Sequence, residues 1–164
     1  MSNGLLTVKC SNCHKETEIP PGTIIADLNG NGVLQIAAPD ITVRFAPGSV
    51  LRGAPADRPG SDLAGVGIRI EGHPGVTISE ARVHGFKCGL WASQTDGLTL
   101  DGGDYSDNFR QRLRSTPAAE EGADWLFPHR NDERKWRDEY GAAIAVESSR
   151  QVTVRDIQIG RAHV

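Results

Sequence analysis

Gly67-Ile68-Arg69-Ile70 and Gly75-Val76-Thr77-Ile78 form a motif that returns 22 residues later as Gly89-Leu90-Trp91-Ala92 and Gly97-Leu98-Thr99-Leu100. The stretch from Gly67 to Asn108 therefore holds one unit written twice. A third copy, Ala143-Ile144-Ala145-Val146 and Gln151-Val152-Thr153-Val154, follows 54 residues after the second, which is one 22-residue step plus an insertion of 32. An earlier, weaker copy is Val33-Leu34-Gln35-Ile36 and Asp40-Ile41-Thr42-Val43, with one residue fewer between its halves.

A fixed period in the low twenties, with short Val/Ile/Leu strands and Gly/Asn/Asp turns, predicts a solenoid of stacked units. Within each unit, alternate apolar side chains such as Ile41 and Val43 are expected to face inward, while Thr42 and Arg44 face outward. One unit is too thin to bury its own apolar face, so neighbouring units must supply the core. The prediction is an all-β fold.

The chain has 164 residues, enough for one domain with a buried core. Its 19 Gly residues exceed the roughly 7 % typical of proteins, so the chain turns often. The sequence predicts an irregular lead-in or N-terminal cap (residues 1–18), a repeat domain (19–158) and a short tail (159–164). The net charge of -3 offers no basic face for nucleic acid, and no apolar run is long enough to span a membrane.

The lead-in holds Cys10-Ser11-Asn12-Cys13-His14, the spacing of a covalent haem attachment site with His14 as axial ligand. We favour the interpretation that the two cysteines are incidental thiols in a cap. Little chain remains to enclose a haem before the Pro20-Pro21-Gly22 turn. Zinc would need more ligands, and His84 and Cys88 are the only conceivable candidates. His84 itself, near the end of a unit, is expected to be a solvated turn residue.

A second candidate ligand set is Asp27-Leu28-Asn29-Gly30-Asn31-Gly32, which matches the first half of a calcium loop through Asp27, Asn29 and Asn31. The match then stops, because Ala38 stands where a bidentate Glu is required. A plain Asn-Gly turn leading into the first strand is the favoured interpretation, and no metal site is predicted.

Two insertions interrupt the repeat, at about 54–64 and 109–140, and both fall after the last strand of one unit and before the first strand of the next. Insertions at one phase of a solenoid gather along one edge, which is commonly the binding face. The longer insertion is predicted to be partly helical: Thr116-Pro117 begins a short turn that Gly122 stops, and Asn131 caps a helix from Asp132 to Tyr140. Trp136 and Tyr140 share a face of that helix, where they either fold the loop onto the units or meet a ligand.

With these features placed, the chain resembles the right-handed parallel β-helix proteins of the pectate-lyase-like superfamily. The units Gly67-Ile68-Arg69-Ile70 to Ile78 and Gly89-Leu90-Trp91-Ala92 to Leu100 look like its repeat, known as the PbH1 repeat, and the likeness covers roughly residues 19–158. The resemblance implies carbohydrate binding or processing, since members include polysaccharide lyases, glycoside hydrolases, uronate epimerases and non-catalytic accessory proteins. Phe127-Pro128-His129-Arg130 only partly echoes the Asp-Pro-His-Asp motif of mannuronan epimerases, because both acidic positions are replaced.

The leading functional hypothesis is an enzyme that acts on a uronate-containing or neutral polysaccharide bound along the insertion-bearing edge. Guanidinium groups pair with carboxylates through two parallel hydrogen bonds, so Arg110, Arg112 and Arg114 are candidates for clamping uronates. His129 and Tyr140 are candidates for moving a proton, as a lyase requires. A glycosidase would instead need two facing carboxylates, for which Asp124 and Asp132 are nominated.

The alternative is a binding or accessory module without catalysis, in which Trp91, Trp125 and Trp136 stack on sugar rings. Trp91 occupies the outward position that Arg69 holds one unit before. Filling a gap beneath a loop is an equally good explanation for that tryptophan. Relatives of this kind are usually exported or periplasmic, although the first nine residues lack the features of a signal peptide.

Ile159 to Val164 can be encoded by ATC GGA AGA GCA CAC GTC, which looks like the start of a common short-read sequencing adapter. The two preceding adapter bases would complete a codon for Gln158. We therefore expect residues 159–164 to be a foreign, adapter-derived tail on an N-terminal fragment whose native frame continues into further units.

Overall fold

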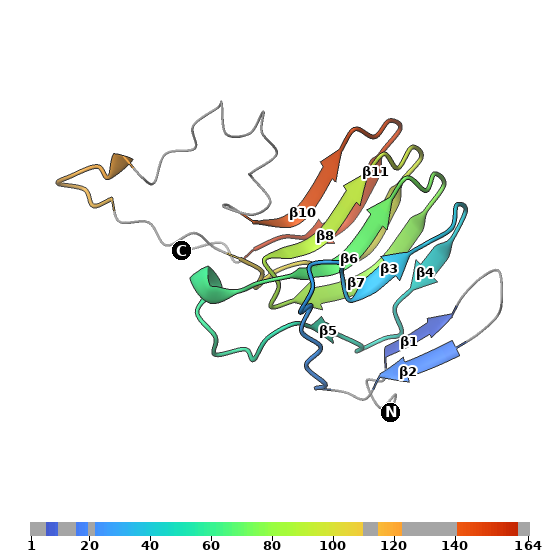
Figure 1. Ribbon diagram of the computed structural model, residues 1–164, viewed down its shortest axis with the longest axis horizontal. Helices are drawn as coiled ribbons and strands as arrows, with labels where there is room; N and C mark the ends of the chain where they lie inside the picture. Colours follow the sequence, from blue (N-terminus) through green and yellow to red (C-terminus); the bar gives the residue numbers. More distant parts are fainter. Residues whose placement is uncertain (1–5, 10–15, 20–21, 110–114, 123–140, 161–164) are drawn as a thin grey trace.

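The computed structural model describes residues 6–9, 16–19, 22–109, 115–122 and 141–160, and these form an all-β protein built mainly from parallel sheets (Figure 1). The first sheet is an antiparallel pair, β1 (Leu6–Lys9) and β2 (Glu16–Ile19). The lead-in is therefore not irregular throughout. Alternation in Leu6-Thr7-Val8-Lys9 and Glu16-Thr17-Glu18-Ile19 is the local pattern that suits such a pair.

The repeats form two further sheets. The four-stranded sheet has the order β10 (Ala142–Glu147), β8 (Cys88–Ser93), β6 (Val66–Glu71) and β3 (Leu34–Ile36). The five-stranded sheet has the order β11 (Thr153–Gln158), β9 (Thr99–Asp104), β7 (Thr77–His84) and β4 (Thr42–Arg44), and β5 (Leu51–Arg52) also pairs with β7. All of these pairings are parallel.

The register of the parallel strands follows the repeat in the sequence. Ile68 lies opposite Leu90, and Ile78 lies opposite Leu100, so each residue pairs with the one 22 positions further along. Leu90 in turn lies opposite Ile144, which is 54 positions on. A one-residue slip would move every apolar side chain to the other face of its sheet, so the buried face fixes this register.

Left-handed backbone conformations recur at the same spacing. Gly75, Gly97 and Gln151 have φ values of 71°, 71° and 56°, and Glu80, Gly102 and Asp156 have values of 56°, 68° and 54°. Residues other than glycine adopt this region uncommonly, and these left-handed residues recur at the same offsets of 22 and 54 residues as the strand partners.

The main core is formed by inward side chains of both large sheets. Ile68, Ile70 and Leu90 come from the four-stranded sheet, and Ile78 and Leu100 from the five-stranded sheet; all five are fully buried. Val43 and Phe45 are also buried, whereas Thr42 and Arg44 are exposed, which confirms the predicted alternation. Because each strand contributes every second side chain, the core is continuous across the stacked strands.

The described parts of the two insertions differ from the regular units. Residues 54–64 run from β5 to β6 and contain one short 3-10 helix, η1 (Gly60–Asp62). In the longer insertion, residues 115–122 form a turn in which Thr116 and Ala119 exchange backbone hydrogen bonds of 2.8 and 3.2 Å. The helix expected over residues 132–140 lies outside the described residues.

Candidate functional site

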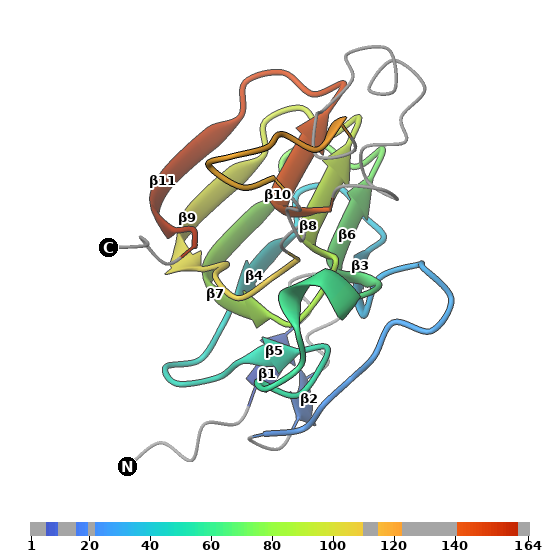
Figure 2. The ribbon, with the colours of Figure 1, turned by 90° about the vertical axis from the view of Figure 1, so that its left-hand side faces the viewer.

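Both insertions join the repeats on one side of the molecule. The first insertion lies between β5 and β6, and the second lies between β9 and β10. At the equivalent place between β7 and β8, the chain has only the short segment 85–87. The backbone N–H of Lys87 donates to the carbonyl of Ala64 at 3.2 Å, and the N–H of Ala142 donates to the carbonyl of Lys87 at 3.0 Å. Residues 53–54, 64–65, 84–88, 107–109 and 141–142 thus form one continuous margin, named here the insertion edge. Figure 1 shows η1 and residues 115–122 on this same side, and both face the viewer in Figure 2.

His84, the last residue of β7, occupies the centre of a polar cluster on the insertion edge. Its Nε2 atom lies 3.8 Å from Asp104 Oδ2, and its Nδ1 atom lies 3.9 Å from Asp107 Oδ2. Its register partner on β5 is Arg52. The histidine is only 7 % exposed, so the expectation of a solvated turn residue was wrong. The cause is that β7 continues to His84 and is flanked there by β5 and by the residues that follow β9.

The environment of His84 favours the neutral imidazole. Burial lowers the pKa of His84 below its ordinary value; Arg52 acts in the same direction, while Asp104 and Asp107 oppose it. Within the part of the chain that the structure describes, Nδ1 is buried without a hydrogen-bond partner. A neutral ring that is flanked by carboxylates, yet not hydrogen-bonded through Nδ1, retains the capacity to accept a proton.

The two carboxylates are more accessible than the histidine. The side chain of Asp104 is 29 % exposed and that of Asp107 is 50 % exposed. Burial by itself raises the pKa of Asp104, but hydrogen bonding from Ser106 and the charges of His84 and Arg82 outweigh it, so the pKa lies below the ordinary value. The backbone N–H of Ser106 donates to Asp104 Oδ1 at 2.9 Å. At neutral pH Asp104 is therefore an ionised group that a ligand can reach.

Asn108 anchors the segment that leaves β9 toward the long insertion. Its side-chain oxygen accepts a hydrogen bond from the N–H of Phe86 at 3.0 Å, and its side-chain nitrogen donates to the carbonyls of Val83 and Tyr105 at 2.8 and 2.9 Å. Because Asn108 is 5 % exposed, these bonds are shielded from water. They hold Asp107, the neighbouring residue, in a fixed position beside His84.

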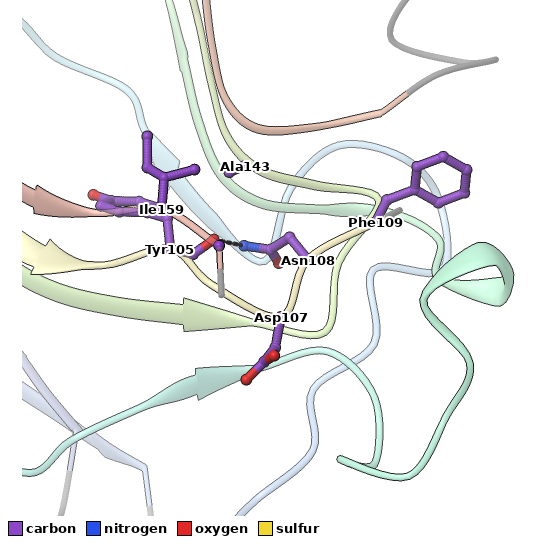
Figure 3. A pocket seen from close by; sticks show the side chains of 7 residues that line it. Tyr105, Asp107, Asn108, Phe109, Ala143 and Ile159 are labelled. Atoms are coloured by element: carbon purple, nitrogen blue, oxygen red, sulfur yellow. Dashed lines mark hydrogen bonds between the residues drawn. The ribbon is translucent and has the colours of Figure 1, made fainter. Parts of the chain in front are cut away.

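A cavity of about 240 Å³ lies next to this anchor and is lined by Tyr105, Asp107, Asn108, Phe109, Ala143, Ile159 and Gly160 (Figure 3). The carboxylate of Asp107 points away from Ala143 and Ile159 in this view. The side-chain amide of Asn108 is hydrogen-bonded to the backbone of Phe86, Val83 and Tyr105. Most of the accessible lining is apolar, and Asp107 is the one member of the His84 cluster among the lining residues.

Trp91 is the one predicted sugar-binding side chain that lies within the described residues. It belongs to an apolar cluster with Val66, Cys88 and Ala145, separate from the main core. The Arg69 guanidinium carbon lies 5.0 Å from the centre of its ring, and its indole N–H donates to Glu147 Oε1 at 3.1 Å. The ring is 6 % exposed. Stacking of Trp91 on a sugar stays a prediction, and it would require the ring to become accessible.

The candidate calcium residues hold their own loop together. Asp27 Oδ2 accepts backbone hydrogen bonds from Gly32 at 3.1 Å and from Val66 at 2.9 Å. Asn29 Oδ1 accepts from the N–H of Asn31 at 3.1 Å, and Asn31 Oδ1 accepts from Arg69 Nη1 at 3.2 Å. Among the described residues, no group of three or more His, Cys, Asp or Glu side chains is arranged to hold a metal ion.

The remaining predicted site residues lie outside the described residues and keep the status of predictions. They are the nominated catalytic residues His129, Tyr140, Asp124 and Asp132, the arginines Arg110, Arg112 and Arg114, the tryptophans Trp125 and Trp136, and the haem-type set Cys10, Cys13 and His14.

One feature of the sequence, the repeat period, could have indicated part of this cluster. Arg82 precedes Asp104 by 22 positions, and the two are register partners on β7 and β9. The repeat period alone therefore places a basic and an acidic residue side by side near the end of the strands. The burial of His84 could not be found in the same way, because it depends on β5 and on the residues after β9.

Comparison of the sequence with protein-family models and with curated proteins found no match, and comparison with solved structures found none either. None of the helical segments in the described ranges is long and apolar enough to traverse a lipid bilayer.

Proposed function

We propose that this chain is a right-handed parallel β-helix protein of the pectate-lyase-like type that binds a polysaccharide along the insertion edge and processes it as a lyase or hydrolase. The fold part of this proposal is supported by parallel pairing between units 22 residues apart and by left-handed residues that recur at the same offsets. Both features are expected when one short unit is stacked repeatedly along an axis.

The observation that carries the functional part is the meeting of His84, Asp104 and Asp107 at the margin where both insertions join the repeats. Loops placed on a rigid scaffold are common sites of binding and catalysis. Titratable residues with shifted pKa values in such a place are candidates for acid–base roles. Here a histidine whose pKa is lowered by burial lies between two accessible carboxylates.

The cluster is suited to moving protons at a bound sugar. Asp104 and Asp107 are accessible enough to touch a ligand, and His84 lies behind them as a neutral base. A lyase removes a proton beside a uronate carboxylate, whereas a hydrolase needs one carboxylic acid and one carboxylate. Arg110, Arg112 and Arg114, which follow Phe109 directly in the sequence, are the groups we assign to uronate recognition in the lyase form of the proposal.

A non-catalytic carbohydrate-binding module is the second candidate. The burial of His84 favours it, because a histidine side chain that is 9 % exposed is poorly placed to touch a substrate directly. In that case the accessible carboxylates and the arginines would bind a glycan without turning it over.

The test uses the full chain with two sets of probes, oligomers of galacturonate and mannuronate, and neutral glucan and galactan oligomers. Binding is measured by calorimetry, and turnover is measured by new reducing ends and by the absorbance of unsaturated products. Asp107→Asn is compared with Asp40→Asn, which makes the same charge change at an exposed residue in the turn between β3 and β4, outside both insertions. An enzyme loses turnover in Asp107→Asn and keeps it in Asp40→Asn.

Each other outcome has a definite meaning. Binding without turnover in the unchanged protein supports the non-catalytic module. Equal turnover in both variants removes the cluster from the mechanism. If neither the acidic nor the neutral probes bind, the carbohydrate function is wrong.

A further inference from the structure

The contacts of His84 with two carboxylates have a different effect when the ring is neutral and when it is protonated. Its nitrogens lie 3.8 Å from Asp104 Oδ2 and 3.9 Å from Asp107 Oδ2. These separations are too long for good hydrogen bonds, which for nitrogen and oxygen span about 2.7 to 3.2 Å. They remain within ion-pair range, so protonation would convert two loose contacts into two charge–charge attractions on opposite nitrogens of one ring.

The charged groups that face His84 come from every described element packed against it. Arg52 of β5 disfavours the protonated ring, while Asp104 of β9 and Asp107 after β9 favour it. Arg82, on the same strand as His84, is the register partner of Asp104 and acts on that carboxylate. With a neutral histidine, these two carboxylates and two guanidinium groups cancel. Protonation of His84 therefore gives the cluster a net positive charge.

The same residues are joined by backbone to both insertions. The N–H of Gly53, the residue before the first insertion, donates to the carbonyl of His84 at 3.0 Å. The N–H of Gly85 donates to the carbonyl of Asp107 at 3.0 Å. Asp107 itself lies two residues before the start of the long insertion. A change of charge on His84 thus acts where both insertions are attached.

We propose that His84 is a protonation switch of the insertion edge: its charged form pairs with Asp104 and Asp107 and binds an acidic glycan more tightly than its neutral form does. Protonation takes the cluster from zero net charge to a net positive charge, and that positive charge attracts a polyanion. The acidic-ligand half of this inference rests on the proposed function, whereas the pairing of His84 with the two carboxylates does not.

Thermodynamic linkage makes the switch quantitative. If an acidic ligand prefers the charged form, the ligand must raise the pKa of His84 by the same free energy by which protonation raises its affinity. Each unit of pKa increase then corresponds to a tenfold increase in affinity between neutral and acidic pH. The two quantities can be measured separately on one protein.

The first experiment follows the titration of the His84 ring by NMR in the full chain, with the signal assigned by its loss in His84→Gln. Asp104→Asn and Asp107→Asn should each lower the titration midpoint, and Arg52→Gln should raise it. Asp40→Asn is the control, because Asp40 bonds Pro74 in the turn before β7 while His84 is the last residue of that strand, and it should leave the midpoint unchanged. If the titration midpoint of His84 is unchanged in both Asp104→Asn and Asp107→Asn, the proposed pairing is wrong.

The second experiment measures affinity for oligogalacturonate and for a neutral glucan oligomer between pH 7.5 and pH 5. Acidic-ligand affinity should rise severalfold as the pH falls, and His84→Gln should remove that rise. His73→Gln, which changes a histidine in the turn after β6, should keep it. If His84→Gln retains the full pH dependence, the switch is wrong. If no glycan binds while the midpoint responds as expected, the proposed function fails and only the pairing of His84 stands.

Discussion

The side-chain oxygen of Asn108 accepts a buried hydrogen bond from the backbone N–H of Phe86, with the two atoms 3.0 Å apart. This bond links the segment after β9 to the short connection between β7 and β8. The two hydrogens of the same amide are used for the carbonyls of Val83 and Tyr105. One buried side chain therefore makes three hydrogen bonds to backbone groups of three different residues.

Asn108→Ala is expected to lower the free energy of unfolding by about 3 kcal/mol or more, because unpaired buried polar groups cost roughly 1 to 3 kcal/mol each. The measurement is equilibrium unfolding in urea. Asn31→Ala is the matched control, since the Asn31 side chain bonds Arg69 in an exposed position. A similar loss in the two variants would contradict the anchoring role of Asn108.

Gly103→Ala should be far more damaging than Gly72→Ala. Gly103 lies on β9 with φ +122°, and a methyl group added there would lie 2.3 Å from the carbonyl oxygen of Ala81, its register partner on β7. We expect a loss of about 3 kcal/mol from this clash and the strained backbone. Gly72 also has a positive φ of +70° but faces open space, so about 1 kcal/mol is expected. Thermal unfolding of both variants compares them directly.

The stability of the protein should decrease as the pH falls below about 6.5, the ordinary pKa of histidine. Burial lowers the pKa of folded His84, so the unfolded chain binds this proton more readily. The contribution of the neutral ring is complete above the unfolded pKa and is lost as the pH falls through the folded value. Urea unfolding at several pH values should show a smaller decrease in His84→Gln. The same slope in both proteins would refute the prediction.

Arg155→Gln should raise the titration midpoint of Asp101. Arg155 Nε and Nη2 donate to the two oxygens of Asp101 at 2.8 and 2.7 Å, and this hydrogen bonding lowers the pKa of the carboxyl group. Both side chains are exposed to water, so the effect on overall stability should be small and should weaken in high salt. Carboxyl NMR titration gives the midpoint, and an unchanged value would count against the pairing.

The repeat period predicted the strand register for two reasons. The 22-residue spacing aligns equivalent residues, and burial of alternate apolar side chains excludes other alignments. Leu90 could be aligned with Ile68 from sequence alone, and the two are register partners in the four-stranded sheet. Apolar side chains at every second position can be buried in only one register. The same logic gave the inward and outward residues of the weak first copy, including Val43 and Arg44.

Features that depend on contacts between distant segments could not be predicted in this way. Asp27 resembles a calcium ligand in its local sequence, yet its carboxylate accepts a hydrogen bond from Val66, 39 residues away. His84 resembles a turn residue until Arg52 and Asp107 are placed beside it. Local patterns describe which side chains face inward, but they do not describe which polar groups meet at the margins of the sheets.

The unequal sequence distances between strand partners have a consequence for folding kinetics. Residues of β6 and β8 meet across 22 positions, whereas those of β8 and β10 meet across 54. Loop-closure entropy grows with the logarithm of chain length, which makes the longer closure about 0.8 kcal/mol less favourable for a flexible chain. Contacts between residues far apart in sequence also slow folding in general. The β6–β8 and β7–β9 pairs are therefore the expected nucleus, and β10 and β11 should be the last strands to dock.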